Sequence, residues 1–215
     1  MLRAIIFDLE GVIIDTESLW DKASAQFLRN HGFLYQREKV KPLMMGRTIE
    51  EGIRVLQEIY GFTGDIKQQA QERRDIAKKL FEKNITFISG FKQFYKTVVK
   101  NYETAIATSL ERGYLNSVSK KLKLSALFKS HIYSIADIGY ISKPNPDIFL
   151  YASSKLGIVP FECLVIEDSP HGVEAAKRAG MKCVAITTSL SAEHFTDTNS
   201  VVDHFRDIDL KKLSK

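Results

Sequence analysis

The sequence predicts an α/β protein, with a Rossmann-like parallel sheet as its core and a small α-helical domain inserted after the first strand. Short, continuous apolar runs recur along the chain, at 4–7, 104–107, 164–166 and 183–186. Such runs are typical of strands buried on both faces of a parallel sheet. Each run is followed by a polar turn and a helical pattern, whereas residues 18–87 contain helical patterns alone.

The catalytic core is expected to comprise residues 1–17 and 88–215. After the second apolar run, a helix is expected over 112–123. After the third, a helix is expected over 172–179, and Gly180 would stop it. Strands that alternate with helices in this way indicate βαβ units.

The inserted segment is expected to form a helical cap over 18–87. Its first helix is predicted at 19–31 and its third at about 65–82. The second helix is expected to begin after Thr48, which can form a capping box with Glu51. The insert holds 13 of the Lys and Arg residues and 9 of the Asp and Glu residues, which is +4 of the net +5. Two interpretations stay open: a solvated helical surface, or a lid whose basic face attracts an anionic substrate.

Composition narrows the class of protein. With 44% apolar and 27% charged residues among 215, the chain is typical of soluble globular proteins. A net charge of +5 is too diffuse to indicate nucleic acid, and no apolar stretch approaches the ~20 residues of a membrane helix. Cys163 and Cys183 lie in apolar runs, as expected of buried thiols in a reducing compartment. We therefore expect a cytoplasmic protein without nucleic-acid or membrane partners, monomeric by default.

Carboxylates follow the first predicted strand. Asp8 and Glu10 come directly after the run, and Gly11 follows them. Ligand sites of open α/β sheets lie at the carboxyl ends of the strands. One carboxylate there can attack phosphorus as a nucleophile and a second can act as general acid and base, although a structural loop would explain the same residues.

Three further polar clusters occur. Thr108 and Ser109 follow the second run, where hydroxyl and amide groups suit either an anion or a plain helix cap. Lys143 lies in a segment stiffened by prolines. Glu167 and Asp168 end the third run, and adjacent carboxylates favour a hard cation such as Mg²⁺. Together these groups are those that phosphoryl transfer requires.

In order and spacing, the four clusters resemble the motifs of the haloacid dehalogenase-like hydrolase superfamily, and most closely its β-phosphoglucomutase-like phosphatases with a helical cap. The strings that carry the resemblance are DLEGVIIDTE, ATS, SKPNPDIF and VIEDSPHGVEAAKRAG. The resemblance implies that Asp8 forms an aspartyl-phosphate and that Thr108, Ser109 and Lys143 hold the phosphoryl group. It also implies Mg²⁺ bound by Asp8, the backbone carbonyl of Glu10 and Asp168, with Glu167 close by.

Glu10 departs from the family pattern, in which phosphatases and mutases carry Asp as acid and base. Glutamate keeps the carboxyl chemistry but adds one methylene, and a misplacement of ~1 Å can cost ~100-fold in rate. The resemblance also places Gly46, Arg47 and Thr48 in a substrate-contacting loop of the cap.

These observations predict a Mg²⁺-dependent phosphatase of a small phosphorylated metabolite, such as a sugar phosphate. Two alternatives remain. A β-phosphoglucomutase-type mutase would need a second cation in the cap, for which Arg47 is the obvious residue. A catalytically weakened binding protein is supported mainly by Glu10. The identity of the substrate does not follow from the sequence.

Overall fold

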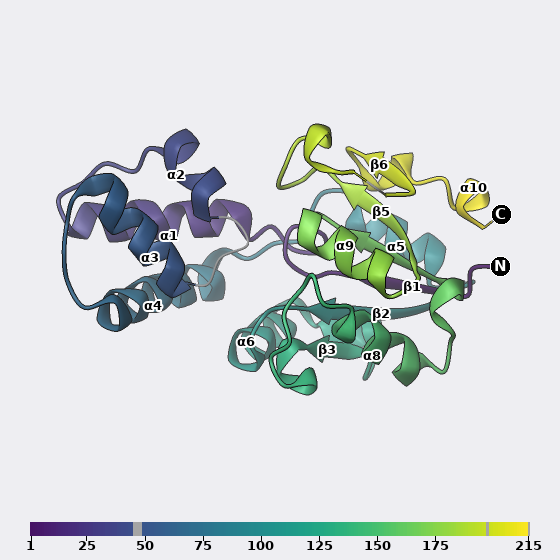
Figure 1. Ribbon diagram of the computed structural model, residues 1–215. Helices are drawn as coiled ribbons and strands as arrows, with labels where there is room; N and C mark the ends of the chain where they lie inside the picture. The colour runs from purple at the N-terminus through teal and green to yellow at the C-terminus, as the bar shows by residue number, and fades with distance from the viewer. Residues whose placement is uncertain (45–48, 197, 215) are drawn as a thin grey trace. The chain divides into compact units, whose positions relative to one another are not determined.

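The computed structural model describes residues 1–44, 49–196 and 198–214. Six parallel strands form one sheet in the order β3-β2-β1-β4-β5-β6 (Figure 1), which confirms the predicted fold class. Their bounds are β1 (Ala4–Phe7), β2 (Glu103–Thr108), β3 (Ile132–Ser134), β4 (Cys163–Glu167), β5 (Lys182–Ile186) and β6 (Ser200–Val202). The four predicted strands are β1, β2, β4 and β5. The short strands β3 and β6 at the two edges were not predicted.

Both faces of the sheet are covered by helices. Ala4 and Ile6 of β1 belong to one apolar core with residues of α8 (Asp147–Leu156) and α9 (Pro170–Arg178). The alternate residue Phe7 packs its ring against aromatic rings of α5 (Phe91–Val98) and α7 (Leu124–Phe128). Because side chains alternate along a strand, β1 contributes to both cores and is fully buried.

The remaining helices around the sheet follow β2 in the sequence. The helices are α6 (Arg112–Leu122) and α10 (Leu210–Leu213), and the short 3₁₀ helices are η1 (Ile135–Ile138), η2 (Pro160–Glu162), η3 (Ala192–His194) and η4 (Phe205–Asp207). The predicted helix stop is present, since Gly180 follows α9 with a φ of +72°.

Strand register aligns the carboxyl ends of the three central strands. Phe7 pairs with Ile106 of β2 and with Ile166 of β4. The residues that follow, Asp8 after β1 and Glu167 at the end of β4, therefore emerge at the same edge of the sheet.

Residues Thr16–Ile85 form a compact helical unit, distinct from the unit of Met1–Asp15 and Thr86–Lys215. Its helices are α1 (Glu17–Asn30), α2 (Arg37–Met44), α3 (Ile49–Tyr60) and α4 (Ile66–Asn84). The unit has its own apolar core, formed by Phe27, Leu28, Val40, Ile53, Leu56 and Ala70. Its ends fall two residues before the predicted 18 and 87, and α2 was not predicted.

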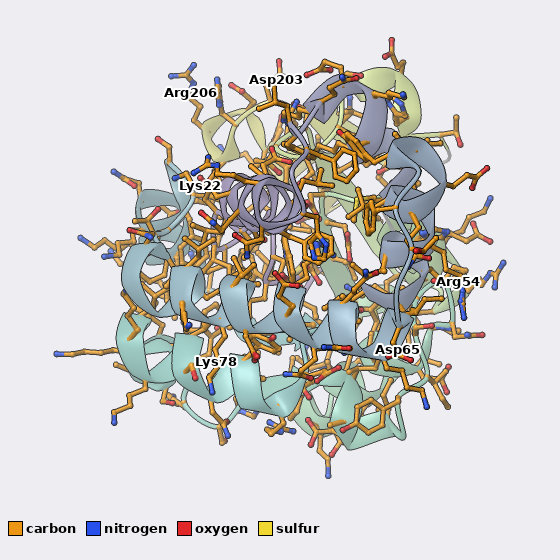
Figure 2. All side chains as sticks on the ribbon, turned by 90° about the vertical axis from the view of Figure 1, so that its left-hand side faces the viewer. Lys22, Arg54, Asp65, Lys78, Asp203 and Arg206 are labelled. Atoms are coloured by element: carbon orange, nitrogen blue, oxygen red, sulfur yellow. The ribbon has the colours of Figure 1, made fainter. Side chains whose placement is uncertain are left out.

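Many charged side chains of the helical unit are exposed. Lys22, Arg54, Asp65 and Lys78, which are labelled in Figure 2, are all exposed. Asp65 also caps α4, because its carboxylate accepts a hydrogen bond from the backbone N–H of Gln68. The predicted cap at Thr48 lies outside the described residues.

Candidate active site

The loop after β1 turns tightly and presents Asp8. The backbone N–H of Asp8 still donates to the carbonyl of Ile166 in β4, 3.0 Å away. The chain then folds back, with Gly11 N–H donating to the carbonyl of Ile14 at 2.8 Å. Asp8 is thereby held at the end of β1 by both its strand and its loop.

Glycine is the residue type that this loop accommodates at position 11. Its φ of +71° lies in the left-handed region, where side chains are strained. A Cβ at Gly11 would also lie 1.8 Å from Oδ2 of Asp168. The glycine therefore lets the Asp168 carboxylate pack directly against the loop of Asp8.

Lys143 joins two of the predicted carboxylates. Its Nζ donates to Oδ1 of Asp8 and to Oε1 of Glu167, each at 2.5 Å. All three side chains are at least nine-tenths buried, and the ammonium also lies 4.8 Å from the ring centroid of Phe149. Three segments distant in the sequence thus meet in one buried ionic cluster.

Burial and charge control the titration of this cluster. Burial raises the pKa of Asp8 to about 7, and the Glu167 carboxylate raises it as well, while Lys143 opposes both. Burial by itself would lower the pKa of Lys143, but its contacts with Asp8 and Glu167 raise it above the ordinary value. The cluster therefore favours a further positive charge next to Asp8.

Glu167 has partners on both of its oxygens. While Oε1 accepts from Lys143, Oε2 accepts from the backbone N–H groups of Asp168 and Ser169 and from the hydroxyl of Ser169, at 3.0 to 3.1 Å. The Ser169 hydroxyl in turn caps α9 by accepting from the N–H of Gly172. Glu167 fixes Lys143 and the start of α9.

Two hydroxyl residues that were not predicted as site residues contact Asp168 and the loop after β1. Ser189 donates from its hydroxyl to Oδ2 of Asp168, and Thr188 donates to the carbonyl of Gly11. Both residues follow β5, the fourth predicted strand. A signal was present, because the polar string 187–189 occupies the same position after its strand as the other clusters.

The other predicted site residues lie at the same edge or outside the described residues. Thr108 is buried at the end of β2, and its hydroxyl accepts from the N–H of Leu110 at 3.0 Å. Ser109 is exposed beside it and Glu10 is half-buried in the loop after Asp8. The cap residues Gly46, Arg47 and Thr48 are not among the described residues.

The donor set fits a hard divalent cation. Among the described residues, no three His, Cys, Asp or Glu side chains form a ready cage for a metal ion. Asp8 and Asp168 instead flank one loop, whose backbone supplies the carbonyl oxygen of Glu10. Carboxylate and carbonyl oxygens are the ligands that Mg²⁺ prefers, and the two carboxylates of Asp8 and Glu167 share a single ammonium group here. The chemistry of the residues present therefore fits Mg²⁺.

Known proteins are similar to this chain over most of its length. The haloacid dehalogenase-like hydrolase pattern matches residues 5–186. YhcW of Bacillus subtilis, named as a phosphatase, is 31% identical over 99% of this chain and 96% of its own. The phosphorylated carbohydrates phosphatase of Thermotoga maritima is 29% identical over 84% of this chain and 83% of its own.

Solved structures show the same fold. ATU0790 of Agrobacterium tumefaciens, a haloacid dehalogenase-like protein, has a TM-score of 0.86 at 24% identity, covering 100% of this chain and 98% of its own. β-Phosphoglucomutase of Clostridium difficile has a TM-score of 0.74 at 24% identity, covering 100% and 96%.

The chain belongs to the haloacid dehalogenase-like hydrolase family, which confirms the resemblance. Within that family it is a phosphatase, a phosphoric monoester hydrolase. None of the helices in the described ranges is long and apolar enough to cross a membrane.

Proposed function

We propose that this phosphatase hydrolyses a small phosphorylated metabolite, of the sugar phosphate class, through an aspartyl-phosphate on Asp8. The observation that carries the proposal is the Lys143 ammonium between Asp8 and Glu167. A buried cation beside a nucleophilic carboxylate stabilises the negative charge of a phosphoryl group as that charge develops.

In the first step a carboxylate oxygen of Asp8 attacks phosphorus and the ester oxygen leaves, taking a proton from Glu10. In the second step Glu10 removes a proton from water, which attacks the phosphorus of the aspartyl-phosphate. Inorganic phosphate is released and the Asp8 carboxylate is restored. The residues act by positioning and by charge stabilisation, and Thr108, Ser109 and Lys143 would hold the phosphoryl oxygens.

Asp8, Asp168 and the backbone carbonyl of Glu10 would hold Mg²⁺, with Glu167 supporting the site through Lys143 and Ser169. When bound, the metal would neutralise charge on the nucleophile and the phosphoryl group. Its presence would also satisfy the preference of the Asp8 cluster for positive charge, because burial already opposes the ionised form of Asp8.

The substrate class is inferred from the relatives. Besides the Thermotoga enzyme, hexitol phosphatase B of Escherichia coli is 28% identical over 86% of this chain and 83% of its own. Both names describe phosphatases of phosphorylated carbohydrates or polyols, so we infer a substrate of the same chemical kind for this chain.

A panel of phosphorylated metabolites tests the proposal by release of inorganic phosphate. With Mg²⁺, we expect one or more sugar or polyol phosphates to be hydrolysed, and chelation of the metal to abolish the release. Release undiminished by chelator would contradict the metal site. A mutase would instead convert a sugar phosphate to its isomer without releasing phosphate, and absence of both reactions would favour a binding protein.

A further inference from the structure

The loop after β5 makes contact with both halves of the Asp8 site. Thr188 donates from its hydroxyl to the carbonyl of Gly11 at 2.5 Å. The neighbouring Ser189 donates to Oδ2 of Asp168. One dipeptide therefore binds the loop after β1 and the residue after β4, which are more than 150 residues apart in the sequence.

The loop after β1, the residue after β4 and the loop after β5 are packed without intervening space. A Cβ at Gly11 would lie 1.8 Å from Oδ2 of Asp168 and 2.7 Å from Oγ of Ser189. Both oxygens thus lie against the same glycine. Movement of Ser189 would change the surroundings of the loop and of the carboxylate together.

The dipeptide is itself anchored to the edge of the sheet. The N–H of Thr187 donates to the carbonyl of Val202 in β6 at 3.0 Å, and its hydroxyl donates to Asp203 at 2.6 Å. Asp203 lies directly after β6. The hydroxyls of Thr188 and Ser189 therefore project from a segment that is fixed at its first residue.

We propose that Thr188 and Ser189 are positioning residues, which fix the Asp168 carboxylate and the Gly11 carbonyl so that the metal oxygens of the site are preorganised. The inference rests on the proposed function, because it assigns the metal to Asp8, Asp168 and the carbonyl of Glu10. A carboxylate already oriented by a donor loses less rotational freedom when a cation binds. Groups that orient metal ligands in this way are typically worth ~10–100-fold in metal affinity.

The test uses the full chain and Mg²⁺ alone, without substrate. Ser189→Ala removes the donor to Asp168, and Thr188→Val removes the donor to Gly11 while keeping the side-chain shape. Ser191→Ala is the matched control, because the exposed Ser191 hydroxyl bonds Glu193 and His194 in the same loop. The affinity for Mg²⁺ is measured from the rise of the melting temperature with Mg²⁺ concentration.

We expect Ser189→Ala to bind Mg²⁺ ~10-fold more weakly and Thr188→Val several-fold more weakly, with Ser191→Ala like the wild type. Phosphate release by Ser189→Ala should recover towards the wild-type rate at excess Mg²⁺. The melting temperature of each variant without Mg²⁺ separates a weaker affinity for the metal from a general loss of stability, because bound Mg²⁺ stabilises the native state in either case.

The outcomes distinguish the positioning role of Thr188 and Ser189 from the proposed function. If the wild type responds to Mg²⁺ and releases phosphate, but both variants bind Mg²⁺ as tightly as the wild type, the positioning role is overturned and the proposed function stands. If the wild type neither responds to Mg²⁺ nor releases phosphate, the proposed function fails and the positioning role fails with it.

Discussion

At the scale of single residues, the site depends on one ammonium group shared by two buried carboxylates. Lys143 lies 2.5 Å from both Asp8 and Glu167, and without it the two carboxylates would repel each other in a medium of low polarity. The lysine thus opposes the effect of burial on the pKa of Asp8, and in the proposed mechanism it would supply the cation next to the phosphoryl group.

Glu10 is the residue at which this chain and its family pattern differ, and its reach is testable. Glu10→Gln should lower phosphate release by ~100-fold or more, because general acid–base catalysis is typically worth 10²–10⁴. Glu10→Asp should keep or raise the activity, since it restores the shorter side chain of the pattern.

The measurement compares both variants with the wild type on one ester with a good leaving group and one with a poor leaving group. A good leaving group needs little protonation, so the loss in Glu10→Gln should be greater for the poor one. Glu10→Gln matching the wild type on both esters would remove Glu10 from the acid and base role.

At the scale of elements, the start of α9 depends on a glycine that leaves room for Glu167. A Cβ at Gly172 would lie 1.9 Å from Cδ of Glu167. Gly172→Ala should therefore displace that carboxylate from Lys143 and Ser169. The expected cost is ~1–3 kcal/mol in the free energy of unfolding, as for other overpacked sites, with a marked loss of phosphate release.

Gly113 in α6 is the matched control, because nothing lies within 4 Å of a Cβ built there. Gly113→Ala should be neutral or stabilise the protein by up to ~1 kcal/mol, since alanine is the better helix former. Thermal unfolding and phosphate release are measured on both variants to test this difference. Equal behaviour of the two alanine variants would contradict the packing argument.

The strands and helices differ in how far the sequence predicts them. The apolar runs of β1, β2, β4 and β5 are continuous because both faces of those strands are buried, so they were recognisable. Strands β3 and β6 have three residues each at the sheet edges, and their runs are too short to distinguish from turns. Helix α2 buries Val40 alone among its fully described apolar residues, so it has almost no apolar face.

The candidate site was also recognisable from the sequence only in part. Asp8, Lys143 and Glu167 belong to strings that are recognisable one by one, and the structure brings them together. The polar string that holds Thr188 and Ser189 was visible after its strand, but these residues donate to partners 177 and 21 positions away, and no local pattern predicts such pairs.

At the scale of the whole molecule, the chain forms two units with separate apolar cores. The helical unit contains Arg73, whose residue surface is 7% exposed. Its guanidinium lies 5.2 Å from the ring centroid of Trp20 and donates to the hydroxyl of Ser24 at 3.2 Å. Within the described part of the chain it makes no ion pair with a carboxylate and its Nε has no hydrogen-bond partner. Burial accordingly lowers the pKa of Arg73 to about 10.

Arg73→Met should raise the free energy of unfolding by ~1 kcal/mol or more, because replacing a buried charge with an apolar side chain of similar length is often stabilising. Ser24 keeps its bond to the carbonyl of Trp20. The control is Arg74→Met on the same helix, which loses an ion pair with Glu50 and should gain nothing. Denaturant unfolding of the three proteins tests this, and a clear destabilisation in Arg73→Met would show that the guanidinium supports the unit.

The central claim concerns the whole enzyme and is that Asp8 is the nucleophile. Asp8→Asn removes the attacking charge but leaves the ion pair of Lys143 with Glu167, so the variant should fold. The decisive measurement is phosphate release by Asp8→Asn and wild type at saturating Mg²⁺, on the best substrate of the panel, with melting temperatures recorded for both. We predict a loss of at least ~1000-fold in a folded protein, because a neutral amide does not attack phosphorus. Release at the wild-type rate by Asp8→Asn would contradict the aspartyl-phosphate mechanism.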